Sequence, residues 1–94
     1  MADQRCVHVR ISGRVQGVSF RAWTQRRATA LGLSGWVRNL ASGDVEAVFS
    51  GYTEHVDAVL ADCKQGPRLA RVARVEIIGA PEPVSGPFRI RADA

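Results

Sequence analysis

The sequence lacks several features that would assign it to a class at once. No apolar run in its 94 residues approaches the ~18–20 residues that a membrane span needs. The first residues contain no apolar stretch typical of a signal peptide, so we expect a cytoplasmic protein that does not bind membranes. The formal net charge is +4, and Lys64 is the only lysine, so all other basic side chains counted in that charge are arginines. These arginines form no basic run, which argues against a nucleic-acid-binding stripe.

Cysteine and histidine are also too sparse for most metal or redox chemistry. Cys6 lies at the start of a strand pattern and Cys63 on the apolar face of a helix pattern, so we expect two buried thiols rather than a disulfide. His8 and His55 are far apart in sequence, with no cysteine or carboxylate at ligand spacing. We read both as surface residues and predict no metal site and no cofactor.

Hydrophobic periodicity divides the chain into five short strands and two helices. Val7, Val9 and Ile11 share one face of an alternating stretch, while Phe20 and Leu31 bound a helical pattern that Gly32 ends. The predicted strands are 6–12, 33–40, 45–50, 71–78 and 88–92, and the predicted helices are 20–31 and 53–65. The order predicts one α+β domain over residues 1–94: a ferredoxin-like βαββαβ sandwich, with two helices on one face of an antiparallel sheet and a short extra C-terminal strand.

The same patterns predict which way particular side chains point. Helical spacing assigns Phe20, Trp23, Thr24, Arg27 and Leu31 to one stripe of the first helix. Phe20 and Trp23 are expected to pack in the core rather than to stack on a ligand. The second helix is predicted to begin with Thr53 as its N-cap and to bury Val56, Val59, Leu60 and Cys63. Val75 and Ile77 should share one face of their strand, and Phe88 and Ile90 should point inward.

A glycine-containing loop between the first strand and the first helix is the main candidate for chemistry. Gly13 and Gly17 can take positive φ angles and let loop N–H groups turn inward. The helix that follows adds unpaired N–H donors and a partial positive charge, so the stretch predicts an anion site, most simply for phosphate. Arg21 then lies in the first helical turn, where a cation opposes the helix dipole by ~0.3–1 kcal/mol. Either Arg21 binds the anion, or it is a surface arginine that bends into solvent.

Common phosphate-handling motifs do not fit this loop. Gly17 is followed by Val18 and not by the Lys-Ser/Thr of a P-loop, and Val15 stands where a cysteine phosphatase needs its thiolate. Ser19 is the only loop hydroxyl, and with no histidine close in sequence it is better read as a small residue that fits the loop than as a nucleophile. What remains is an anion site suited to an already activated substrate, such as a mixed carboxylic–phosphoric anhydride.

Three stretches together resemble the acylphosphatase family: residues 13–21 (GRVQGVSFR), residues 35–39 (GWVRN) and residues 43–46 (GDVE). The resemblance implies the ferredoxin-like fold and metal-independent hydrolysis of acyl phosphates to a carboxylate and inorganic phosphate. It also implies that Arg21 binds the phosphate and that Asn39 orients the attacking water. The backbone that would hold the phosphate, here called the phosphate cradle, belongs to Arg14, Val15, Gln16, Gly17, Val18, Ser19 and Phe20.

The residues themselves are compatible with those roles. Arginine offers a planar fork of donors that matches phosphate oxygens. Asn39 alternates with Val37, so it should share the helix-covered face of its strand, at an end that can approach the cradle. An uncharged amide can accept a hydrogen bond from water and so aim it. Without the resemblance, Asn39 would be read as a turn residue before Ser42 and Gly43.

Two other functions share the predicted fold. An RNA-binding module would stack bases on aromatics of the first and third strands, but residues 6–12 contain no aromatic and Phe49 lies in a core-like pattern. An acylphosphatase-like domain that acts on carbamoyl phosphate within a larger protein is the other alternative. We favour a free-standing, monomeric enzyme with a small acyl phosphate as substrate, with inorganic phosphate as product and competitive inhibitor, and with no nucleic-acid partner.

Overall fold

The computed structural model describes residues 3–94 and has the element order expected from the sequence. Each predicted strand and helix is present, with ends that differ by a few residues. The strands are β1 (Gln4–Arg14), β2 (Ser34–Asn39), β3 (Val45–Tyr52), β4 (Arg71–Gly79) and β5 (Arg89–Ile90), and the helices are α1 (Phe20–Ala30) and α2 (Thr53–Cys63). The predicted α+β, ferredoxin-like fold is therefore confirmed.

The sheet has the strand order β4-β1-β3-β2-β5. The pairs β1–β3, β1–β4 and β2–β3 are antiparallel, as predicted. The short strand β5 pairs with β2 in parallel, through Trp36–Arg89 and Val37–Ile90, so the complete sheet is mixed, and the antiparallel prediction holds for its four longer strands. The parallel pairing runs the C-terminal segment along the edge of β2, toward the strand end that carries Asn39.

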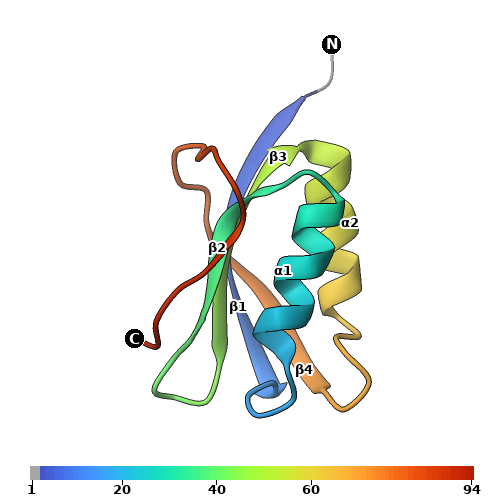
Figure 1. Cartoon of the computed structure of the whole chain (residues 1–94), viewed down its shortest axis with the longest axis vertical. Helices are drawn as coiled ribbons and strands as arrows, with labels where there is room; N and C mark the ends of the chain where they lie inside the picture. Colours follow the sequence, from blue (N-terminus) through green and yellow to red (C-terminus); the bar gives the residue numbers. More distant parts are fainter. Residues whose placement is uncertain (1–2) are drawn as a thin grey trace.

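Both helices cover the same face of the sheet, and the core lies between the two layers (Figure 1). Val7, Val9 and Ile11 of β1 are 0–2% exposed, which confirms the alternation read from the sequence. In α1 the fully buried positions are Phe20, Thr24 and Ala28, with Trp23 and Leu31 packed beside them. Arg27 does not belong to this stripe, because it lies on the exposed flank and pairs with Asp62 of α2.

One further local expectation is wrong, and another holds only in part. Tyr52 occupies the N-cap of α2, and Thr53 is the first helical residue, with no side-chain cap hydrogen bond. Val75 and Ile77 share one side of β4, as expected, but only Val75 packs on the core, and Ile77 is 49% exposed. β4 is an edge strand, and Val72 and Val75 are its residues that pack against the core.

The face of the sheet opposite the helices is partly covered by the segment before β5. The Val84 N–H donates to Ser50 Oγ at 3.2 Å, and Cys6 Sγ contacts Glu82 O at 3.6 Å. Cys6 is consequently buried here, while Cys63 is buried in the core, and both are free thiols as expected. Burial raises the pKa of the Cys63 thiol to about 12, with a smaller effect from Asp62. Within residues 3–94 no helix is long and apolar enough to cross a bilayer.

This topology brings two chain-distant segments to one end of the molecule. The loop between β1 and α1 lies at the same end as the turn between β2 and β3 (Figure 1). Leu40 and Asp44 close that turn through a hydrogen bond from Leu40 N–H to Asp44 O at 2.9 Å. The loop that carries the predicted phosphate cradle therefore faces the strand end that carries Asn39.

Candidate active site

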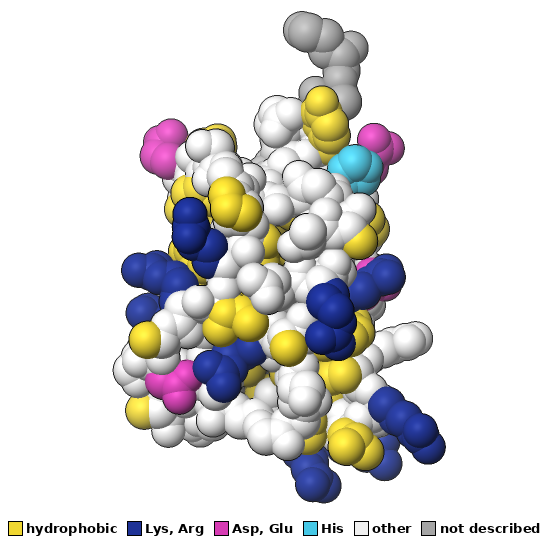
Figure 2. Space-filling model, in the orientation of Figure 1, with side chains coloured by type: hydrophobic (Ala, Val, Ile, Leu, Met, Phe, Trp, Pro, Cys, Tyr) yellow, Lys and Arg dark blue, Asp and Glu magenta, His cyan; other side chains and the backbone are white. Residues whose placement is uncertain are grey.

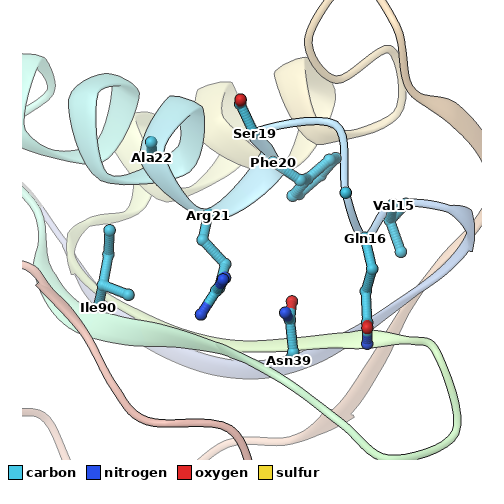
Figure 3. Close-up of a pocket in the computed structure, with 9 residues that line it drawn as sticks. Val15, Gln16, Ser19, Phe20, Arg21, Ala22, Asn39 and Ile90 are labelled. Carbon is cyan, nitrogen blue, oxygen red and sulfur yellow. The ribbon is translucent and has the colours of Figure 1, made fainter.

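A cavity of about 460 Å³ opens between the phosphate cradle, the first turn of α1, the end of β2 and β5. Figure 3 shows Arg21 and Asn39 reaching into this space from opposite walls. The residues that line the cavity are Val15, Gln16, Gly17, Ser19, Phe20, Arg21, Ala22, Asn39 and Ile90. The structure thus brings together the two side chains and most of the loop residues selected from the sequence; Arg14 and Val18 do not line the cavity.

The shape of the cradle follows from which of its side chains are buried. Val15, Val18 and Phe20 are each no more than 7% exposed, so they anchor the loop in the core and leave its backbone at the surface. Gly17 has φ +72° and Ser19 has φ +63°, both left-handed conformations that turn the chain sharply. Gly13 also has positive φ, but it belongs to β1 and not to the loop. A Cβ at Gly13 would lie 2.2 Å from Arg71 O, so a close strand approach explains that glycine.

The loop and the helix start contain a continuous series of main-chain donors with no acceptor among residues 3–94. Among the hydrogen bonds of residues 3–94, none is donated by a main-chain N–H between residues 15 and 22. The first backbone hydrogen bond of α1 runs from Trp23 N–H to Ser19 O at 3.0 Å. Because polar N–H groups seldom remain unpaired without a ligand or water to accept them, this segment is suited to bind an anion.

Arg21 is the second residue of α1, and its side chain points into the cavity (Figure 3). Its Nη1 lies 3.1 Å from Asp93 Oδ1, and its side chain keeps 38% of its surface exposed. The first turn of α1 contains no acidic residue. The guanidinium is therefore held at one corner by the C-terminal segment, with its other donors directed at the space beside the cradle.

Asn39 is the last residue of β2, paired with Val45 of β3. It is only 9% exposed and shares the helix-covered face with Val37, as its alternation predicted. Its main-chain carbonyl accepts from Ala94 N–H at 3.0 Å, so the chain terminus packs against the same strand end. The side-chain amide faces Arg21 across the cavity (Figure 3).

Three features of the site were not predicted. Ile90 was expected only to point inward; its side chain forms part of the cavity wall and is 41% exposed. Asp93 pairs with Arg21 across 72 residues of sequence, and no local pattern signals such a contact. The Gln16 side chain leaves the cradle and donates to Leu40 O and Asp44 O, at 2.8 Å each. The only sequence signal for this Gln16 contact is that a polar residue lies between two apolar ones, Val15 and Val18.

The remaining candidates lie outside the cavity chemistry. Ser19 Oγ points away from the cavity (Figure 3), which fits its reading as a loop residue rather than a nucleophile. His8 is on the opposite face of the sheet, 2.9 Å from Glu46 Oε2, and His55 packs edge-on against Tyr52. No group of three or more potential metal ligands occurs among residues 3–94. Arginine and lysine side chains are spread over the face shown in Figure 2 rather than gathered in one patch.

Comparison with known proteins gives a consistent result. A family model described as Acylphosphatase matches residues 7–90. An acylphosphatase from Methylococcus capsulatus is 56% identical over 71 residues, which cover 76% of this chain and 77% of that protein. The structure of an acylphosphatase from Coxiella burnetii superposes with a TM-score of 0.84 at 38% identity, covering 95% of this chain and 94% of the other. An acylphosphatase from Bacillus subtilis has the same TM-score at 27% identity, with 95% and 99% covered. The RNA-binding alternative receives no support from these matches.

Proposed function

The chain belongs to the acylphosphatase family and hydrolyses acyl phosphates, and from that premise we propose that Arg21, Asn39 and the phosphate cradle carry out the reaction. The observation that supports these roles is the convergence of all three on one cavity. Each alone has an ordinary structural explanation. Together they supply an anion-binding backbone, a cation and an uncharged amide around one space large enough for a phosphoryl group.

The cradle and Arg21 bind the phosphoryl group in this proposal. The unpaired N–H groups between residues 15 and 22 donate to phosphoryl oxygens, and the dipole of α1 favours the negative charge. Arg21 adds a charged, planar pair of donors from the same helix turn. Because these donors are fixed by the fold, they stabilise charge that builds on the phosphoryl oxygens without reorganising during the reaction.

Asn39 positions the nucleophile. Its amide oxygen accepts a hydrogen bond from a water molecule and aims that water's oxygen at phosphorus. A bond forms between the water oxygen and phosphorus, and the bond between phosphorus and the bridging oxygen breaks. The acyl group leaves as a carboxylate, and a phosphoryl oxygen takes the water's proton. A carboxylate is a stable leaving group, so the reaction needs neither a protein general acid nor a nucleophilic side chain.

Turnover of a synthetic acyl phosphate such as benzoyl phosphate tests these roles. We expect Arg21→Ala and Asn39→Ala each to lower kcat/KM by at least ~10²–10³, the usual effect of removing a preorganised donor. Arg27→Ala is the matched control, because it removes an arginine and an ion pair from the same helix without reaching the cavity. Near wild-type turnover in Arg21→Ala or Asn39→Ala, with the fold intact by circular dichroism, would contradict the assignment.

The proposal extends to the enzyme's requirements and setting. We propose that residues 1–94 act as a single monomeric domain, without a metal, on a small acyl phosphate, and that inorganic phosphate competes with substrate. Two free thiols fit a reducing, cytoplasmic setting. Full activity in excess chelator, competitive inhibition by phosphate and a monomeric mass by light scattering are the expected results.

A further inference from the structure

Gln16 differs from the rest of the cradle in where its side chain goes. Val15 and Val18 on either side point into the core, whereas the Gln16 amide spans from the loop to the β2–β3 turn. Its Nε2 lies 2.8 Å from Leu40 O and 2.8 Å from Asp44 O. Both acceptors are carbonyl oxygens, so only the NH₂ end of the amide can satisfy them, and it uses both of its protons.

The two carbonyl groups that accept from Gln16 belong to Leu40 and Asp44, the residues that close the β2–β3 turn beside Asn39. Leu40 follows Asn39 directly, and Asp44 precedes Val45, the strand partner of Asn39. Leu40 N–H donates to Asp44 O at 2.9 Å, and Gly43 N–H donates to Leu40 O at 3.1 Å. The Gln16 amide therefore holds the hydrogen-bonded β2–β3 turn at a fixed distance from the cradle.

We propose that Gln16 is a positioning residue, whose side chain sets the distance between the bound phosphoryl group and the water aimed by Asn39. This inference rests on the function proposed above for Asn39. The phosphate-binding groups, the cradle and Arg21, all lie within residues 14–21, so they keep their mutual geometry without this link. Asn39 lies on a different strand, and the Gln16 side chain joins that strand's end directly to the loop.

The turn also has a second attachment, which supplies a matched control. On the opposite face of the sheet, Arg10 Nε donates to Asp44 Oδ2 at 2.6 Å and Arg10 Nη2 to Ser42 Oγ at 3.3 Å. Arg10 thus holds the same turn but does not contact the cradle. Gln16→Met and Arg10→Met each remove two hydrogen bonds to the turn, yet only Gln16→Met separates the turn from the phosphate site.

The test compares kcat on benzoyl phosphate with the inhibition constant of inorganic phosphate. We expect Gln16→Met to lower kcat by ~10–100-fold, because displacements of about 1 Å can cost ~10² in rate, and to leave the phosphate inhibition constant within about twofold. Arg10→Met should keep kcat within about threefold. Gln16→Asn retains an amide that is one methylene too short to span, and it should repeat the kcat loss if Gln16→Met folds poorly.

Three results would overturn the inference while leaving the roles of Arg21 and Asn39 intact. One is an unchanged kcat in folded Gln16→Met or Gln16→Asn. Another is a phosphate inhibition constant that weakens in proportion to kcat, which would assign Gln16 to the cradle alone. The third is an equal kcat loss in Arg10→Met, which would show that any loosening of the turn suffices. Wild-type activity in Asn39→Ala would instead refute the proposed function itself.

Discussion

Arg21 on the helix-covered side of the sheet and Arg38 on the opposite side are both partly exposed arginines with a carboxylate neighbour. Arg38 Nε contacts Glu46 Oε1, and the Arg38 guanidinium lies 5.1 Å from the centroid of the Trp36 ring. The Arg91 guanidinium lies 4.7 Å from the same centroid. Glu46 is shared with His8 and has only 11% of its side chain exposed. Arg21 has one ion pair, with the 63% exposed Asp93, and otherwise faces the cavity.

The difference shows that residue type alone does not decide what a guanidinium contacts. On the opposite face, carboxylate and aromatic partners occupy the guanidinium, so Arg38 contributes to packing and charge balance. At the cavity, Arg21 stands beside unpaired backbone donors with most of its own donors unoccupied, an arrangement that leaves capacity for a ligand.

Replacing each arginine by lysine should give the largest difference in activity between the two faces of the sheet. Arg21→Lys keeps the charge but loses the planar fork, so we expect kcat/KM for benzoyl phosphate to fall by ~10² or more. Arg38→Lys should keep kcat/KM within about threefold. Steady-state kinetics on both variants provides the measurement, and equal losses would remove the distinction between the two faces.

Glu46→Gln should affect stability and not catalysis. Burial raises the pKa of Glu46, but hydrogen bonds from Arg38 and His8 outweigh that effect and hold the pKa below its ordinary value of 4.5. A lowered folded-state pKa gives stability that is complete above about pH 4.5 and is lost as the pH falls through the folded-state pKa. We expect the variant to lose ~1–3 kcal/mol at pH 7 in urea unfolding and to show less additional loss on acidification than the wild type.

Ser19 tests the strain of the cradle backbone. Its φ of +63° is the only positive value at a non-glycine residue among residues 3–94. Ser19→Val should therefore cost ~1–2 kcal/mol, because a β-branched side chain is disfavoured in the left-handed region, whereas Ser19→Gly should not destabilise. Ser12→Val, in extended β1, is the control on the opposite face. Thermal unfolding of the three variants would show whether the strain is local to the cradle.

Asp93→Asn should give the smallest change. Removing the carboxylate that competes for Arg21 should lower the inhibition constant of inorganic phosphate by ~2–5-fold at low ionic strength, since exposed ion pairs contribute only ~0–1 kcal/mol. The gain should fade in ~0.5 M salt, which screens exposed charges. A weaker phosphate affinity would instead show that Asp93 orients Arg21 productively.

Much of the fold and part of the candidate site were predictable, for local reasons. The alternation of Val7, Val9 and Ile11 and the glycine-marked loop gave the first strand and the cradle, and the phase shared by Val37 and Asn39 gave the buried face. The errors lie where long-range contacts decide. Ile90 faces the cavity because β5 pairs in parallel with β2 at the sheet edge, and short strands carry too little periodicity to predict such pairing.

The resemblance to acylphosphatases implied which residues act, but the sequence by itself determined three placements: a loop in which Gly17 can take a positive φ, Arg21 in the first turn of the helix that follows, and Asn39 on the inward phase of its strand. These follow from backbone conformation and periodicity, which depend on near neighbours. Only the tertiary structure decided that Asn39 faces Arg21, that Asp93 pairs with that arginine and that Gln16 reaches the turn beside Asn39. Those contacts join segments far apart in sequence, and burial of the shared core brings them together.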